Sequence, residues 1–450
     1  MSGRRARVFS LAARACVAIA VVAAGAASAA TYTVTTTADS GAGSLRQAIT
    51  NANGHAGADV IAFAVPGTGV HTIAPLSELP AVTDTVTIDG YTQPGSHPNT
   101  LAGGDDGLLR VDLSGVAAPA GAEGLVLQHD GCIVRGLAIH GFHPENGSSG
   151  GDGIVVNANG CIIAGNFVGT DPSGVVADGN TEAISISGNA NRVGGLSTAD
   201  RNLIVASVNA VGVRASGDAT VIQGNFIGLD ATGYGDLGNR GAGIFIGGQT
   251  ATIGGTNPAA ANAIAFNGGA VIVPDGASAG IAILRNAIFG NQTNSRGMGG
   301  IDLGYDGLTG NDACDGDTGA NGLQNSPVLT SAVSDSGTVD LAFTLNSEPS
   351  TPYRVEFFAS HECDSSGSGQ GQYFIGAVTA MTDAGCNVSA TAHLPVCLEG
   401  QFVITATATN PAVGTSEFSS CLPLTVAAGT NCRTIIPAPP PAARVVHGRD

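Results

Sequence analysis

A repeat of about sixty residues constrains this chain more than any other feature of its sequence. The run GNFVGTDPSG begins at Gly165, and the run GNFIGLDATG begins at Gly224, 59 residues later. A weaker third copy, RNAIFGN, begins at Arg285. A fixed period of this length indicates stacked units, each of which contacts only its neighbours.

Each repeat contains three short runs in which apolar residues alternate with small or polar ones, the period of a β-strand. Glycine or Asn-Gly closes each run, as a tight corner requires. We therefore expect coils of about 20 residues, none of which can bury its apolar face alone. Stacking such coils, with strands about 4.8 Å apart, predicts a parallel β-helix with one continuous apolar interior.

The repeat also predicts which side chains face that interior. One set of aligned apolar residues should point inward: Val134, Ile163, Ile222 and Leu284. One set of aligned asparagines should stack at a corner and is interpreted as structural: Asn166, Asn225 and Asn286.

Composition excludes several other classes of protein. With 43% hydrophobic residues and 68 glycines in 450, the chain is neither disordered nor a coiled coil. The absence of Trp and an aromatic content of 4% count against an outer-membrane barrel, which needs aromatic girdles. A formal net charge of −18 opposes binding to nucleic acid, whose backbone repels it.

The first 29 residues have the pattern of a secretory signal peptide. Arg4 and Arg5 precede a short apolar core, and Ala27-Ser28-Ala29 is a small-residue cleavage site. No later segment is apolar and long enough to span a membrane as a helix. The sequence therefore predicts a secreted or cell-surface protein without a membrane span after signal removal.

Residues 30–115 are predicted to form an N-terminal cap and the first coils, and residues 116–325 the β-helix repeats. Ser44 is a good helix N-cap, and Gln47 three residues later completes a capping box. The apolar face of the short helix that follows should plug the open end of the stack: Leu45, Ala48, Ile49 and Ala52.

The run GSLRQAI, which begins at Gly43, resembles the CSLREA motif of bacterial exported β-helix proteins. The runs VTIDGYTQPGS, NGLQNSPVL and YRVEFFAS…SEFSSC are similar to the same group, and the likeness covers roughly residues 31–425. Gly43 and Gln47 stand where that motif has Cys and Glu. The resemblance implies export and a right-handed parallel β-helix followed by a β-sandwich module, but no single activity.

Residues 326–428 are predicted to form a small Ig-like β-sandwich, because alternating strands there are separated by turns. Residues 429–450 form a Pro-rich tail that is expected to be disordered.

Eight cysteines remain after removal of the signal peptide, and an even number in an exported chain suggests disulfides. No Cys-x-x-Cys pair is present, which argues against a zinc site. The sequence does not determine the pairing; our expectation joins Cys363 to Cys421 and Cys386 to Cys397.

A segment rich in Asp and Gly, IDLGYDGLTGNDACDGDTG, offers the strongest polar cluster. Flexible loops that supply many oxygen atoms suit Ca²⁺, and the alternative is a solvated acidic linker. The candidate calcium ligands are Asp302, Asp306, Asn311, Asp312, Asp315 and Asp317. No other cofactor is indicated.

Two weaker candidate sites lie in the repeats. His143 and Asp152 flank the run HPENGSSGGD, which should lengthen one coil, and they could act as an acid–base pair on a sugar, although exposed surface residues are the alternative. Asp171 and Asp230 occupy equivalent loops and could bind a ligand, although Asx-turns explain them equally well.

These features favour an exported, non-catalytic, monomeric scaffold that acts in surface adhesion or glycan binding and recognises an extracellular glycan or a cell-surface partner. The alternative is a polysaccharide lyase or a glycoside hydrolase, an analogy based on fold alone. The motifs of serine hydrolases and zinc proteases are absent from the sequence.

Overall fold

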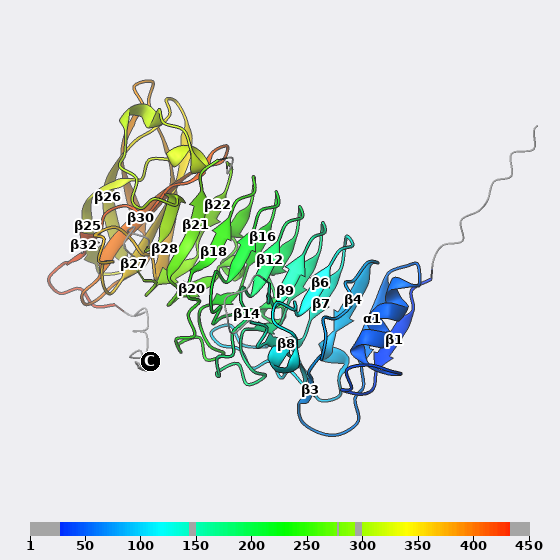
Figure 1. The fold of residues 1–450 in the computed structure, drawn as a ribbon. Helices are drawn as coiled ribbons and strands as arrows, with labels where there is room; N and C mark the ends of the chain where they lie inside the picture. Colours follow the sequence, from blue (N-terminus) through cyan, green and yellow to red (C-terminus); the bar gives the residue numbers. More distant parts are fainter. Residues whose placement is uncertain (1–27, 144–149, 277–278, 293–298, 433–450) are drawn as a thin grey trace, which may run out of the picture.

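A computed structural model describes residues 28–143, 150–276, 279–292 and 299–432. Coils stack along one axis from α1 and β1 at one end to a group of longer strands at the other (Figure 1). The all-β, parallel β-helix architecture predicted from the sequence is confirmed, with one short α-helix. Most of the predicted signal peptide and tail, residues 1–27 and 433–450, lie outside the described residues.

Three parallel sheets form the β-helix, and each coil contributes one strand to each sheet in turn. Sheet A consists of β1 (Thr31–Val34), β2 (Asp59–Phe63), β4 (Val86–Asp89), β7 (Ile133–Arg135), β10 (Ile162–Ala164), β13 (Arg192–Gly194), β16 (Val221–Gln223), β19 (Thr252–Gly254) and β22 (Ala282–Leu284). Sheet B consists of β3 (His71–Ile73), β5 (Val111–Ser114), β8 (Leu137–His140), β11 (Phe167–Val168), β14 (Leu203–Ile204), β17 (Phe226–Ile227), β20 (Ala263–Ala265) and β23 (Ala287–Phe289). Sheet C consists of β6 (Leu125–Leu127), β9 (Ile154–Val156), β12 (Ile184–Ile186), β15 (Val213–Ala215), β18 (Ala242–Ile246), β21 (Gly269–Pro274) and β24 (Ile301–Gly304).

The coils are longer than the sequence suggested. Ile133, Ile162, Arg192 and Val221 are successive register partners in sheet A, so one coil contains about 30 residues rather than about 20. The sequence period spans two coils because neighbouring coils turn their first corner differently. The tight Gly-Asn corner of one coil alternates with a longer corner that contains a 3-10 turn, as at Thr198–Asp200.

The coil that contains the run from His143 to Asp152 has the same length as its neighbours, so the prediction that this run lengthens the coil was wrong. The loops between sheets B and C are long in other coils as well, for example between β11 and β12.

The interior is a ladder of β-branched and leucine side chains. Val134, Ile163 and Ile222 face inward as predicted, with Val193 between the last two. Leu284 does not join this ladder, because it pairs with Gly254 and is half-buried. Ile283 takes the inward place, since the third repeat copy is shifted by one residue relative to our alignment.

Stacked asparagines line one corner, and five of them form one chain rather than the predicted three. Asn202 lies between Asn166 and Asn225, and Asn262 lies between Asn225 and Asn286. The Asn225 side chain accepts a hydrogen bond from Asn202 Nδ2 at 2.9 Å and donates one to Asn262 Oδ1 at 3.0 Å. It also donates to the Val193 carbonyl at 3.0 Å, so a buried corner has its polar groups paired.

Glycine is required where neighbouring coils approach most closely. Gly169 and Gly228 occupy equivalent corners with φ of +98° and +87°. A Cβ atom at these residues would lie 1.9 Å from the Val205 carbonyl oxygen and 2.0 Å from that of Ala265. Both the conformation and the contact exclude a side chain, which explains part of the high glycine content.

The N-terminal helix α1 (Leu45–Asn53) covers the open end of the stack. Ser44 caps it by accepting a hydrogen bond from the Gln47 N–H at 3.2 Å. The predicted apolar face is buried against the first coils: Leu45, Ala48, Ile49 and Ala52.

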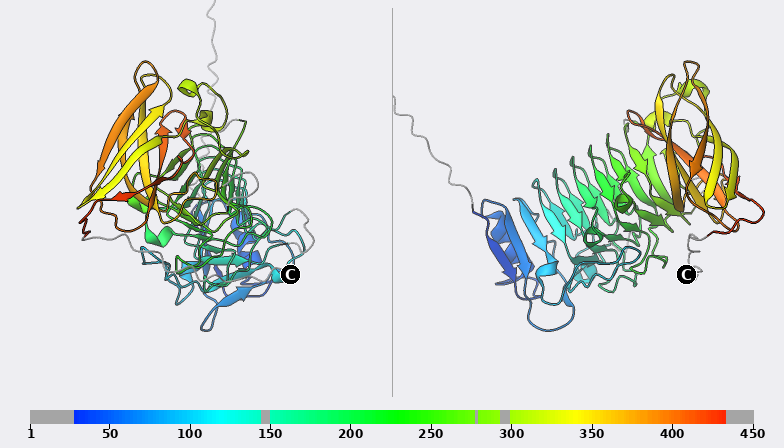
Figure 2. Two further views of the ribbon diagram at one scale, coloured as in Figure 1. Left: turned by 90° about the vertical axis from the view of Figure 1, so that its left-hand side faces the viewer. Right: turned by 180° about the vertical axis from the view of Figure 1, so that it is seen from behind.

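After β24 the chain changes to two mainly antiparallel sheets that enclose a separate core, an arrangement consistent with a sandwich (Figure 2). One sheet consists of β29 (Asn387–Leu394), β26 (Thr338–Asn346), β25 (Val328–Asp335) and β33 (Thr425–Val426). The other consists of β28 (Tyr373–Met381), β27 (Pro352–Ser360), β30 (Val403–Asn410) and β31 (Gly414–Thr415), with β32 (Leu422–Pro423) also paired to β30.

This second unit closes the other end of the β-helix. The Thr415 N–H donates to the Ile281 carbonyl at 3.0 Å, which continues the backbone pairing of sheet A. A second asparagine stack ends at Asn291, whose Nδ2 donates to Gln370 Oε1 at 2.9 Å. Groups of the last coil that would otherwise lack partners are therefore paired by the sandwich.

The asparagine stack should contribute strongly to stability. We expect Asn225→Ala to lower the free energy of unfolding by at least about 2 kcal/mol, because it leaves buried backbone and side-chain groups of two coils without partners. Asn189→Ala is the matched control, since Asn189 joins coils at an exposed corner where water can replace it. Equal losses in chemical denaturation of the two variants would contradict the stabilising role of burial.

Candidate functional site

A row of three carboxylates lies where successive coils enter sheet C. Glu123, Asp152 and Glu182 precede β6, β9 and β12 by one or two residues. The Asp152 N–H donates to Glu123 Oε2, and the Glu182 N–H donates to Asp152 Oδ1 at 3.2 Å. Coil-to-coil pairing thus places like charges side by side along one edge of sheet C.

Arg214 on β15 neutralises one end of this row. Its guanidinium binds Glu182 through Nη2 at 2.6 Å and Nε at 2.8 Å, a bidentate ion pair. The guanidinium carbon also lies 4.9 Å from the ring centroid of Phe245 on β18. The Phe245 ring in turn packs edge-on against Tyr305, with centroids 6.0 Å apart.

We name Glu123, Asp152, Glu182, Arg214, Phe245 and Tyr305 the sheet C row. Tyr305 follows β24 and remains 39% exposed, so the aromatic end of the row is accessible. The row combines hydrogen-bond acceptors, one charged donor and aromatic surface on a rigid sheet.

Electrostatics distinguish the carboxyls of the row. Burial and the charges of Glu123 and Glu182 raise the pKa of Asp152 to about 7. Burial likewise raises the pKa of Glu123, whereas the hydrogen bond to Glu182 raises the pKa of Arg214. Near neutral pH, Asp152 can therefore exchange a proton while Glu182 remains paired with a cation.

The predicted pair of His143 and Asp152 is only partly accounted for. His143 is exposed and adjoins residues 144–149, which lie outside the described residues, and no hydrogen bond in the described part joins it to Asp152. The neighbours of Asp152 are Glu123, Glu182 and Arg214, which our sequence analysis missed. A coil length of about 30 residues would have aligned the three carboxylates.

The equivalent aspartates of the repeat loops have structural partners. Asp171 Oδ1 accepts hydrogen bonds from the N–H and hydroxyl of Ser173. Asp230 Oδ1 accepts from the N–H and hydroxyl of Thr232 and from the Gly235 N–H. These contacts have the form of Asx-turns, the alternative that the sequence offered.

A buried histidine holds two carboxylates on the other side of the same coils. His140 Nε2 lies 2.7 Å from Asp112 Oδ1, and Nδ1 lies 2.6 Å from Asp178 Oδ2. Burial lowers the pKa of His140, but the two carboxylates outweigh it and raise the pKa overall. The charged form of His140 therefore joins β5, β8 and the loop before β12.

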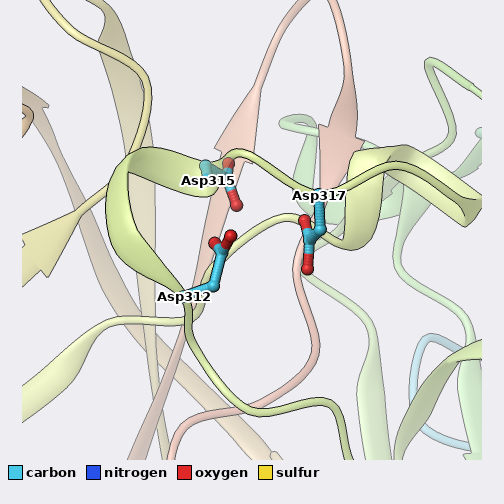
Figure 3. Close-up of side chains that lie close together, drawn as sticks. All are labelled: Asp312, Asp315 and Asp317. Atoms are coloured by element: carbon cyan, nitrogen blue, oxygen red, sulfur yellow. The ribbon is translucent and has the colours of Figure 1, made fainter.

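The predicted calcium ligands separate into two groups. Asp312, Asp315 and Asp317 lie together, with one oxygen atom of each within 4.8 Å of the others (Figure 3). Burial raises the pKa of Asp315 to about 6 and also raises the pKa of Asp317. Asp317 Oδ1 is buried without a hydrogen-bond partner, as expected of an atom that would bind a cation.

The other predicted ligands serve different contacts. Asn311 Oδ1 accepts from the Ser326 N–H at 2.9 Å, while Asp302 and Asp306 lie near Glu417, which comes from the segment after β31. Glu417 is only 4% exposed and accepts hydrogen bonds from the N–H groups of Leu303 and Thr309, each at 2.9 Å. Burial and the nearby aspartates raise the pKa of Glu417 to about 8.

Three disulfides fasten the C-terminal part of the chain. Cys363 is joined to Cys421, as the sequence led us to expect. The expected bond between Cys386 and Cys397 is wrong. Cys386 is joined to Cys314 in the acidic loop, and Cys397 to Cys432. The loop and the C-terminal segment bring distant cysteines closer than the strand spacing suggested.

No protein-family model and no curated protein match this chain. Among solved structures, the Dettilon tailspike protein gp208 aligns over 83% of this chain and 90% of that chain, with 13% identity and a TM-score of 0.26. No inference about function rests on so weak a match. No helix in the described residues is long and apolar enough to cross a membrane.

The buried carboxyl of Glu417 predicts a specific pH dependence. Its pKa is higher in the fold than in the unfolded chain, so its contribution to stability is complete in acid and is lost as the pH rises through about 8. We expect the melting temperature to fall between about pH 6 and about pH 9, and to fall less in Glu417→Gln.

Glu78→Gln, which changes an exposed carboxylate, is the control and should keep the wild-type pH dependence. If Glu417→Gln shows the same fall as the wild type, Glu417 does not titrate in this range.

Proposed function

We propose that this chain is an exported, non-catalytic β-helix scaffold that binds an extracellular glycan through the sheet C row. The three disulfides are compatible with an extracellular protein. Parallel stacking offers a long, rigid face, which suits a polymer made of repeated sugar units.

The observation that supports glycan binding best is the adjacency of Glu182, Arg214, Phe245 and Tyr305. Sugar hydroxyls donate hydrogen bonds to carboxylates and accept them from guanidinium groups, and the C–H faces of a sugar ring pack on aromatic rings. The net negative charge of the row and of the chain favours neutral glycans over acidic polysaccharides. Surface adhesion through a cell-surface partner would use the same accessible face.

Glycan binding can be tested on an array of neutral and acidic glycans. We expect binding to neutral glycans, weakened at least about tenfold by Tyr305→Asn, which removes the ring but tolerates the positive φ of this residue. Tyr234→Asn is the matched control, since Tyr234 is 54% exposed outside the row. Equal binding by both variants would separate the row from recognition, and a silent array would remove the glycan proposal.

One observation favours a second candidate function, that of a polysaccharide lyase or a glycoside hydrolase. Asp152, whose pKa burial and two neighbouring carboxylates raise to about 7, could donate a proton to a leaving sugar while Glu182 stays ionised. Release of reducing or unsaturated ends from the bound glycans, lost in Asp152→Asn, would replace binding by cleavage as the function.

We further propose that Asp312, Asp315 and Asp317 bind Ca²⁺ and stiffen the loop held by the bond between Cys314 and Cys386. Ca²⁺ takes six to eight oxygen ligands, which these carboxylates could supply together with backbone carbonyls or water. Because the pKa of Asp315 is about 6, protons should compete with the ion in mild acid.

We expect added Ca²⁺ to raise the melting temperature at neutral pH and a chelator to lower it. Asp317→Asn should abolish this response, whereas Asp306→Asn, an exposed aspartate outside the cluster, should keep it. Identical melting curves with Ca²⁺ and with chelator would exclude the proposed site.

A further inference from the structure

Two thiols lie against each other inside the β-helix. Cys132 and Cys161 are 0% and 1% exposed and are the free cysteines of the described residues, whose other six cysteines form disulfides. Cys132 Sγ lies 3.4 Å from the Asp84 carbonyl oxygen, and Cys161 Sγ lies 3.5 Å from that of His129.

The register of sheet A makes the two cysteines neighbours. Ile133 pairs with Ile162, so the residues directly before them start adjacent strands one coil apart, and both side chains point into the core. Adjacent strands of a sheet are about 4.8 Å apart, which lies within the Cα separation of about 4.4–6.8 Å found in disulfides. The hydrogen bond between the thiols raises the pKa of Cys132 and lowers that of Cys161, as contact between the sulfur atoms requires.

We propose that Cys132 and Cys161 form a fourth disulfide, which closes one complete coil of the β-helix. The Cys161 thiolate attacks one sulfur of a protein or small-molecule disulfide, the class of oxidant that the other three bonds also require. The Cys132 thiolate then displaces that sulfur from the mixed disulfide. Two protons leave the cysteines, the oxidant is reduced to two thiols, and one S–S bond forms in the chain.

The order of events follows from burial. Neither thiol can meet an oxidant once the coils have closed, so exchange must take place while this part of the β-helix is still open. The bond would then shorten the search for the correct register, because it joins residues that are 29 positions apart and adjacent in the fold.

The location links this bond to the sheet C row. The closed coil contains β8 and β9 and includes Asp152, which directly precedes β9. A covalent tie at the start and end of this coil would hold Asp152 in register with Glu182 of the next coil. The inference stands on the geometry of the two thiols and does not depend on glycan binding.

The test is a thiol count on the full chain produced in an oxidising compartment. The protein is unfolded in denaturant without reductant, treated with an alkylating agent, digested and analysed by mass spectrometry. We expect no alkylation of Cys132 or Cys161, and one cross-linked peptide pair that is two hydrogens lighter than the separate peptides. Complete alkylation of both cysteines in protein whose other six are bonded would overturn the proposal, as would a bond from either to a different cysteine.

Two variants provide controls. Cys161→Ser should leave one alkylated cysteine, Cys132, which shows that the reagent reaches this position after unfolding. The double variant Cys132→Ser, Cys161→Ser should fold, since serine is slightly smaller, and should melt several degrees below the wild type. If reduced, alkylation-competent wild type melts at the same temperature as the untreated protein, no stabilising bond exists between these cysteines.

Discussion

The structure depends on the pairing of each coil with the next through backbone hydrogen bonds. A solenoid has two open ends, and every corner between strands would otherwise bury N–H and C=O groups without partners. Asparagine side chains satisfy these groups at the corners, and helix α1 and the sandwich cover the ends. The sandwich is therefore part of the β-helix in a physical sense, because Gln370 and Thr415 complete its last coil.

Much of this fold could be predicted from the sequence because it depends on local patterns. Alternation identified strands whose inward residues, such as Ile163 and Ile222, are buried in one ladder. The cap at Ser44 depends on a contact three residues long and was equally predictable. The coil length was not, because two types of corner alternate and the sequence repeats only where the type repeats.

The candidate sites were less predictable, because contacts across coils are set by register rather than by sequence proximity. The cluster of Asp312, Asp315 and Asp317 is local and was recognised. Glu417 reaches the neighbourhood of Asp302 from more than a hundred residues away, and no pattern near either residue indicates it. The error over Cys386 has the same origin, since its partner lies in a loop before the sandwich.

The rigidity of a stacked sheet also explains why like charges persist beside one another. In a flexible loop, Glu123, Asp152 and Glu182 would separate, whereas coil-to-coil pairing holds their backbones in register. The repulsion therefore becomes a raised pKa at Asp152 instead of a displacement. A ligand that supplies hydrogen-bond donors to this edge would relieve the repulsion without moving the scaffold, which is the physical reason to expect binding there.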